Sequence, residues 1–107
     1  MKNKNSQSSP QKTHIVLRPL TLGDTLQPEY VIRRLPATIG RHPGNDIELS
    51  FEAVSRFHAR LEQDNDRIML LDLQSSNGTF INGKRVRQAP VHDQDTVDIG
   101  RISFTIS

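Results

Sequence analysis

Turn-forming residues recur along most of this chain and leave little room for helices. After residue 13, glycine, proline, asparagine or aspartate interrupts the sequence roughly every eight to ten residues. The segments between these residues are short, and their apolar positions show no sustained helical period. Helices of globular proteins usually need about ten residues or more, so this spacing favours strands.

Several segments carry the strand pattern, and isoleucine, leucine and valine supply most of their apolar positions. They cover residues 15–17, 30–35, 37–39, 47–49, 59–63, 67–73, 79–81, 85–86, 96–99 and 102–106. About ten short strands with turns between them are typical of a β-sandwich or a barrel. An all-β fold of either kind gathers its loops at the ends of the sheets, where we expect the functional residues.

Two Asn-Gly pairs lie close together in the segment S-S-N-G-T-F-I-N-G-K at residues 75–84. The second pair, Asn82-Gly83, has the residues of a tight type I′ hairpin, because asparagine and glycine accept positive φ values. The segment also has the Gly and Gly-Lys spacing of a nucleotide-binding phosphate loop. That loop needs serine or threonine after the lysine and a helix that begins there, whereas Arg85 follows and Pro90 comes soon after. The segment therefore indicates a hairpin and argues against an NTPase.

The positive charge of the chain is concentrated at its start. Three of the fourteen lysines and arginines lie in residues 1–13, which contain no acidic residue. Residues 14–107 therefore carry eleven basic and twelve acidic residues, a net charge of −1. Nucleic-acid binding needs positive charge on the folded body and aromatic residues for stacking, so this balance and the single tyrosine argue against it. We expect residues 1–12 to be a disordered polar and basic tail.

The length of 107 residues suits one domain, which we place at residues 13–107. No apolar run approaches the roughly 20 residues of a membrane span, and the first residues lack the apolar segment of a secretory signal. The chain has no cysteine, which fits a reducing compartment. These features favour a cytoplasmic domain without a membrane partner.

Catalytic and metal-binding patterns are weak in this sequence. Ser55, His58 and Asp72 form only a nominal triad, because no Gly-x-Ser-x-Gly elbow surrounds a serine and a triad is defined by geometry. The histidines at positions 14, 42, 58 and 92 include no i,i+4 pair and have no cysteine companions, which argues against zinc. We interpret His58 as a structural residue whose ring nitrogens bond to backbone. The sequence thus predicts no enzyme activity, no cofactor and no metal.

One arginine lies where an anion site would be expected. Ile39 is apolar and Gly40-Arg41 follows it, so we expect the strand to end with Arg41 at its rim. A guanidinium forms two parallel hydrogen bonds to phosphate oxygens. Hydroxyl groups such as those of Ser55 and Ser76, together with backbone N–H groups of tight turns, would complete the shell around an anion.

Four loop segments, taken in order, resemble the forkhead-associated (FHA) domain. They are Gly40-Arg41, Ser55-Arg56-Phe57-His58, Ser75–Thr79 and Asn82-Gly83. Residues 42–47, 72–73 and 95–100 agree with the same family in the same order. The resemblance covers roughly residues 14–107 and rests on the order and spacing of all these motifs together.

The resemblance implies a two-sheet β-sandwich of about ten to eleven short strands, similar to FHA and SMAD domains, with ligand loops at one end. FHA domains bind phosphothreonine peptides. By motif, Arg41 and Ser55 would bind the phosphate, Arg56 and Ser76 would add contacts, and Asn77 would hydrogen-bond the peptide backbone. Six further residues would shape and brace the loops without touching the ligand: Gly40, His58, Gly78, Thr79, Asn82 and Gly83.

The sequence departs from the family pattern in the loops that would read the peptide. Ser76 stands where threonine is common, which keeps the hydroxyl and removes a methyl group. Ala53 lies in the loop that often reads the third residue after the phosphothreonine, and it brings no charge. Phe51 and Glu52 in the same loop would supply an apolar contact or repel acidic residues. The peptide preference therefore stays open.

The resemblance implies a phosphothreonine-peptide binding module that mediates phosphorylation-dependent protein–protein interaction in Ser/Thr kinase signalling. Its partner would be a phosphothreonine-containing protein, a Ser/Thr kinase or its substrate, and the domain would be a monomer. The alternative is an FHA-fold scaffold that binds a protein partner independently of phosphate. A further hypothesis is that Thr13, or a serine among Ser6, Ser8 and Ser9, is phosphorylated and occupies the domain's own site.

Overall fold

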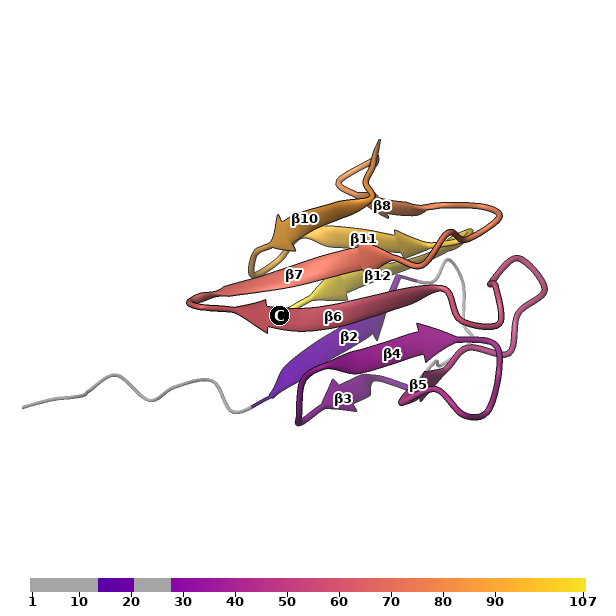
Figure 1. Cartoon of the computed structure of the whole chain (residues 1–107), viewed down its shortest axis with the longest axis horizontal. Coiled ribbons are helices and arrows are strands. Elements are labelled where there is room, and N and C mark those ends of the chain that lie inside the picture. Colours follow the sequence, from indigo (N-terminus) through magenta and orange to yellow (C-terminus); the bar gives the residue numbers. More distant parts are fainter. Residues whose placement is uncertain (1–13, 21–27) are drawn as a thin grey trace, which may run out of the picture.

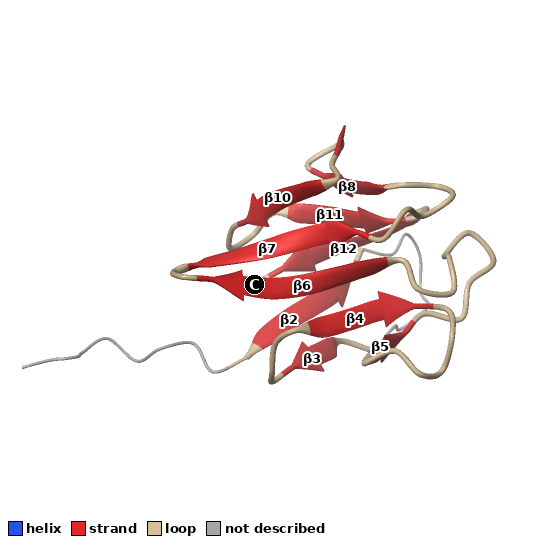
Figure 2. Cartoon of the chain, viewed as in Figure 1, coloured by secondary structure: helices blue, strands red, loops and turns tan. Residues whose placement is uncertain are grey.

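The computed structural model describes residues 14–20 and 28–107. The expected tail at residues 1–12 and its candidate phosphorylation sites lie outside these described residues. The described residues form eleven strands, β2 to β12, and no helix (Figures 1 and 2). The predicted all-β class is therefore confirmed. Within the same residues, nothing has the helical length and apolar character needed to cross a membrane.

The first sheet has five strands in the order β10-β7-β6-β4-β5. In that order they are Gln88–Val91, Arg67–Asp72, Ala59–Asp64, Ala37–Gly40 and Ile47–Glu48. Neighbours in this sheet pair antiparallel except β4 and β5, which run parallel. The chain therefore doubles back through residues 41–46 before β5 begins, and this loop leaves the sheet at the end of β4.

The second sheet has six strands in the order β3-β2-β12-β11-β8-β9, and all its neighbours are antiparallel. In that order they are Tyr30–Ile32, Ile15–Pro19, Ile102–Ile106, Thr96–Ile99, Thr79–Ile81 and Lys84–Arg85. The first and last strands of the described chain, β2 and β12, are direct neighbours. Two sheets of this kind form a sandwich, as the resemblance implied.

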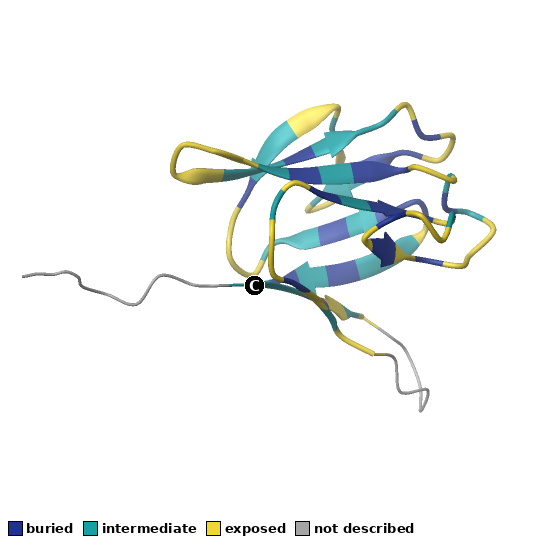
Figure 3. Ribbon diagram, turned by 60° about the horizontal axis from the view of Figure 1, so that its bottom comes forward, coloured by how far each residue is buried: buried dark blue, intermediate teal, exposed yellow. Residues whose placement is uncertain are grey.

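The hydrophobic core lies between the two sheets. Along β4 the residues Ala37 and Ile39 are buried, and along β11 the residues Val97 and Ile99 are buried while Asp98 between them is not. This alternation places every second side chain in the core, and the dark blue bands of Figure 3 follow it. The largest core side chain is that of Phe104. Its ring packs edge-to-face against the ring of Tyr30, with the two ring centroids 6.1 Å apart.

The second Asn-Gly pair forms the β8–β9 hairpin. Asn82 has a φ of 51° and Gly83 a φ of 83°, the positive values that a type I′ turn requires at both central positions. The side chain of Asn82 also reaches the neighbouring strand: its amide nitrogen donates to Asp95 Oδ1 at 3.0 Å, and its oxygen accepts from Thr96 N at 2.9 Å. The hairpin is thereby fixed to the start of β11.

Two strands differ most from the sequence prediction. The strand expected at residues 30–35 ends at Ile32, and β10 at Gln88–Val91 was not predicted. Strand β10 contains Pro90, and proline cannot donate a hydrogen bond to a sheet. In the structure β10 pairs with β7 alone and lies at the edge of its sheet, where proline is tolerated.

Three loops meet at one end of the sandwich, at the right in Figure 1. They are the β4–β5 loop at residues 41–46, the β5–β6 loop at residues 49–58 and the β7–β8 loop at residues 73–78. Because β4 and β7 end at this side and β6 begins there, the topology brings together segments that are far apart in the sequence. All five residues predicted to touch a ligand lie in these loops.

Candidate functional site

Backbone hydrogen bonds hold the β4–β5 loop against the β5–β6 loop. The N–H of Arg41 donates to the carbonyl of Ser55 at 2.9 Å, and the N–H of His42 donates to the carbonyl of Arg56 at 3.1 Å. These bonds place Arg41 beside Ser55 although the two residues are fourteen positions apart. The ring of His42 also stacks on Phe57, with ring centroids 5.1 Å apart.

Gly40 permits this close approach. A Cβ atom at this position would lie 2.2 Å from the carbonyl oxygen of Arg56, which is a backbone atom without freedom to move aside. The buried side chain of Asn45 occupies the same region and donates to the carbonyls of His42 and Arg56 at 2.8 and 2.7 Å. Gly40 is thus required by packing, which agrees with its predicted structural role.

His58 joins the β5–β6 loop to the β7–β8 loop. Its side chain is 0% exposed. Nδ1 accepts a hydrogen bond from Ser55 N at 3.0 Å, so the ring proton lies on Nε2, which donates to the carbonyl of Gly78 at 2.8 Å. Burial lowers the pKa of His58 more than the Gly78 carbonyl and the charge of Asp72 raise it, which keeps the ring neutral. Both ring nitrogens are bound to backbone, so the nominal Ser-His-Asp triad has no catalytic geometry.

Asp72 organises the β7–β8 loop from the end of β7. Its carboxylate accepts hydrogen bonds from the hydroxyl and the N–H of Ser75 and, at 2.7 Å, from the hydroxyl of Thr79. The hydroxyl of Ser75 in turn accepts from Gly78 N at 3.0 Å. Burial alone would raise the pKa of Asp72, but these hydrogen bonds and the nearby His58 lower it below its usual value.

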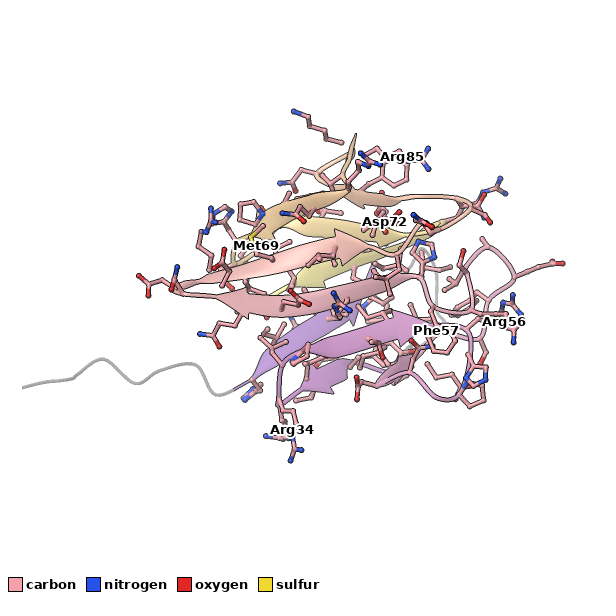
Figure 4. All side chains as sticks on the ribbon, in the orientation of Figure 1. Arg34, Arg56, Phe57, Met69, Asp72 and Arg85 are labelled. Carbon is pink, nitrogen blue, oxygen red and sulfur yellow. The ribbon has the colours of Figure 1, made fainter. Side chains whose placement is uncertain are left out.

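The predicted ligand residues line one open pocket of about 300 Å³ between the loops. Five lining residues had been predicted to touch a ligand: Arg41, Ser55, Arg56, Ser76 and Asn77. Glu52, Ala53 and Val54 complete the wall. Figure 4 shows Arg56 at this end of the sandwich, pointing away from the core. The structure therefore brings together every residue of the predicted set.

Several of these side chains also brace the pocket. Arg41 Nε donates to the carbonyl of Val54 at 3.0 Å, which holds its guanidinium along the wall. The hydroxyl of Ser55 accepts from Ser76 N at 3.0 Å, and the amide nitrogen of Asn77 donates to the carbonyl of Ala53 at 2.8 Å. These two bonds tie the β5–β6 loop to the β7–β8 loop. Arg41, Ser55 and Asn77 are thus bracing residues of the loops as well as predicted ligand residues.

The polar groups that remain available suit an anion. Within the described chain, no hydrogen bond or ion pair engages the terminal nitrogens of Arg41, the guanidinium of Arg56 or the hydroxyl of Ser76. Two guanidinium groups and neighbouring hydroxyls offer several donors to one doubly charged group. The described residues contain no group of three or more His, Cys, Asp or Glu side chains placed to hold a metal ion.

The predicted structural residues divide between two places. Gly40, His58, Gly78 and Thr79 surround the pocket, whereas Asn82 and Gly83 form the β8–β9 hairpin. The sequence interpretation gave no structural role to three other residues that brace the site: Asn45, Asp72 and Gly100. Gly100 has a φ of 64° and its N–H donates to the carbonyl of Gly78, while a Cβ there would lie 2.5 Å from the carbonyl of Ala53. The role of Asp72 could have been predicted, because an aspartate three residues before Ser75 and seven before Thr79 is well placed to accept their hydrogen bonds.

The two-sheet sandwich carries, between its end loops, a pocket whose lining includes two arginines and one glutamate. Comparison with known families identifies the kind of sandwich. The family profile described as "FHA domain" matches residues 37–100, and the chain belongs to this family. The matched region contains all three loops of the pocket and both Asn-Gly pairs.

Two known proteins illustrate the relationship in sequence. The ABC transporter ATP-binding/permease protein Rv1747 of Mycobacterium tuberculosis is 39% identical over 92 residues, which cover 86% of this chain and 10% of the transporter. The glycogen accumulation regulator GarA of the same species is 35% identical over 72 residues, which cover 67% of this chain and 44% of GarA. The chain therefore spans less than half the length of these two relatives.

A solved structure of Mycobacterium tuberculosis EmbR in complex with a low-affinity phosphopeptide is similar in fold. It is 29% identical to this chain and superposes with a TM-score of 0.80. The similar region covers 94% of this chain and 26% of the EmbR chain. The sandwich and its strand arrangement are thus shared by a protein that holds a phosphopeptide.

Proposed function

We propose that the pocket binds phosphothreonine peptides and that the protein is a non-enzymatic module for phosphorylation-dependent interaction. The observation that carries this proposal is the convergence of Arg41, Ser55, Arg56, Ser76 and Asn77 on one open pocket. Membership of the FHA family supports it. The similarity to EmbR, solved with a phosphopeptide, and to GarA, a regulator, points in the same direction.

Each residue has a distinct part in this proposal. The terminal nitrogens of Arg41 bind two phosphate oxygens, and the hydroxyls of Ser55 and Ser76 donate to the phosphate. Arg56 adds a second positive charge from the β5–β6 loop. Asn77 bonds the peptide backbone beside the phosphothreonine, as its position at the pocket rim allows. No bond is made or broken, so the chemistry is recognition alone.

The partner in this proposal is a phosphothreonine-containing protein of Ser/Thr kinase signalling, either a kinase or its substrate. The domain acts as a monomer in the cytoplasm, without nucleic acid, membrane, cofactor or metal. Residues 13–107 form the binding domain and residues 1–12 a tail. One phosphate and a few backbone hydrogen bonds give an expected dissociation constant near micromolar, about −8 kcal/mol.

Peptide titration with and without the phosphate tests the proposal. An oriented phosphothreonine peptide library selects the probe, and binding is then measured by calorimetry. Arg41→Ala is expected to abolish measurable binding, because loss of one partner of a buried charge pair costs roughly 2–5 kcal/mol. Arg34→Ala removes an exposed arginine of the β3–β4 connection, at the lower edge of the sandwich in Figure 4 and away from the three loops, and is the matched control, expected to bind as the wild type does.

Thermal melting separates lost binding from lost folding, since Arg41 Nε also holds the Val54 carbonyl. Arg41→Lys keeps a positive charge and loses the paired nitrogens, so it is expected to bind weakly while remaining folded. An Arg41→Ala variant that binds as tightly as the wild type contradicts the assignment. Equal affinity for the peptide with and without phosphate would instead favour the phosphate-independent scaffold.

A further inference from the structure

A second hollow lies beside the candidate phosphate pocket. It has a volume of about 960 Å³ and is formed by the end of β7, the β7–β8 loop and the segment from β9 to β10. Ser75 lines this second hollow, whereas the next two residues, Ser76 and Asn77, line the phosphate pocket. The β7–β8 loop is therefore the partition between the two spaces, with one face toward each.

The side chain of Arg85 packs against the β7–β8 loop at Gly78. A Cβ atom on Gly78 would lie 2.9 Å from Nε and 3.2 Å from Cζ of Arg85, so the missing side chain of Gly78 makes room for the guanidinium. Arg87 is placed by the backbone, because its carbonyl accepts a hydrogen bond from Asp72 N at 2.8 Å. Both arginines line the second hollow. Figure 4 shows Arg85 beside the β8–β9 hairpin and Asp72 at the end of β7.

The second hollow is electropositive. Arg85 and Arg87, which line it, are exposed, and neither side chain forms an ion pair with any described residue. Among the described residues, Asp72 is the only carboxylate that lines the hollow, and hydrogen bonds from Ser75 and Thr79 already occupy it. The two guanidinium groups therefore outnumber the single carboxylate of the hollow, and neither forms an ion pair with it in the part of the chain that the structure describes.

We propose that Arg85 and Arg87 form a second recognition site for aspartate or glutamate side chains of the same phosphothreonine peptide. This inference rests on the proposed phosphopeptide function. A guanidinium binds a carboxylate through two parallel hydrogen bonds, so both arginines suit this ligand. An extended peptide advances about 3.3 Å per residue, so a residue two to four positions from the phosphothreonine lies roughly 7–13 Å along the peptide from it.

The charge pattern also gives the site a direction. On the β5–β6 loop, Glu52 supplies the one carboxylate among the described residues that line the phosphate pocket. Acidic peptide residues that leave the phosphate toward Glu52 meet a like charge, whereas those that leave across the β7–β8 loop meet Arg85 and Arg87. Acidic residues are therefore selected on one side of the phosphothreonine only.

An oriented peptide library tests the inference. Its peptides carry a fixed phosphothreonine and degenerate neighbours, and they are selected on the wild type and on the R85Q/R87Q variant. The wild type is expected to enrich aspartate and glutamate two to four positions from the phosphothreonine on one side. In fluorescence anisotropy, the best peptide is expected to bind about fivefold more tightly than a copy with asparagine and glutamine at those positions. R85Q/R87Q is expected to bind both peptides equally.

The R33Q/R34Q variant is the control for overall charge, because it removes two exposed arginines from the β3–β4 connection. It is expected to keep the acidic preference. The inference is overturned if phosphothreonine peptides bind but show no acidic enrichment, or if R85Q/R87Q keeps the enrichment. It is also overturned if R33Q/R34Q loses the preference to the same degree. Absence of all phosphate-dependent binding overturns the proposed function and this inference with it.

Discussion

Two residues hold the β7–β8 loop, and each must be deprotonated to do so: Asp72 as a carboxylate and His58 as a neutral ring. Asp72 is a carboxylate that accepts three hydrogen bonds from Ser75 and Thr79, and His58 is a neutral ring that bridges Ser55 and Gly78. The pKa of each group is lower in the folded protein than in a free chain. Protonation of either one removes an interaction that the loop needs.

Stability is therefore expected to fall on acidification in two steps. The unfolded chain takes up a proton on His58 below about pH 6.5, which the folded protein resists because the His58 pKa is lowered. The free energy of unfolding is thus full above that pH and declines below it. Asp72 adds a second loss below about pH 4, as the pH approaches its own lowered pKa. Urea unfolding at a series of pH values measures both steps.

Substitution of His58 tests whether this residue causes the first loss of stability. His58→Gln is expected to be less stable at neutral pH and to lack the decline that begins below about pH 6.5. His92→Gln, at an exposed position, is the control and is expected to retain it. Retention of the full decline in His58→Gln would show that another group titrates in this range.

The sequence predicted the site residues that belong to recognisable motifs. It did not predict the residues whose role depends only on a contact with a distant part of the chain. Arg41, Ser55 and Asn77 belong to motifs whose spacing is distinctive, and the structure places them on one pocket. The bracing roles of Asn45 and Gly100 depend on carbonyls of residues 11 and 47 positions away, Arg56 and Ala53. Contacts of this kind follow from tertiary packing, which a single sequence does not display.

At the scale of elements, Gly40 and Gly83 are required for two different reasons, close packing and backbone conformation. Gly40 ends β4 under the Arg56 carbonyl, whereas Gly83 lies in the β8–β9 hairpin, where an added Cβ would meet no atom within 4 Å but φ is 83°. Gly40→Ala is expected to destabilise the fold by about 3 kcal/mol or more, because backbone must move. Gly83→Ala is expected to cost about 1–2 kcal/mol, the strain of a left-handed alanine.

Urea unfolding at neutral pH measures both losses, and peptide binding adds a second comparison. Gly40→Ala displaces the loop that carries Arg56, so it is expected to weaken phosphopeptide binding, whereas Gly83→Ala leaves the pocket intact. Equal losses of stability in the two variants would contradict the packing role of Gly40.

Strands were predicted correctly where turn residues border an apolar run. They were missed at a sheet edge, where a strand tolerates residues such as proline that a central strand excludes. The hairpin at Asn82-Gly83 was predicted because positive φ values select its residues. Strand β10, which was missed, contains Pro90, a residue that a sheet tolerates at its edge and not in a central strand. The parallel pairing of β4 with β5 was not predicted either, since strand pairing is set by packing across the whole sandwich.

At the scale of the whole molecule, residues 13–107 are expected to fold and bind without the first twelve residues. The described core lies within residues 14–107, where β2 packs into the second sheet between β3 and β12. A chain of residues 13–107 is expected to melt within about 2 °C of the full chain and to bind the same phosphothreonine peptide equally well. Calorimetry of the two chains measures both quantities. A loss of affinity would show that the first twelve residues take part in binding.

The pairing of β2 with β12 has a practical outcome. The N–H of Val16 donates to the carbonyl of Ser107 at 2.8 Å and the N–H of Ser107 donates to the carbonyl of Val16 at 3.0 Å, at the opposite pole from the three loops (Figure 1). A fluorescent protein, an affinity handle or a sensor surface attached through Ser107 would leave the mouth of the pocket open to incoming partners.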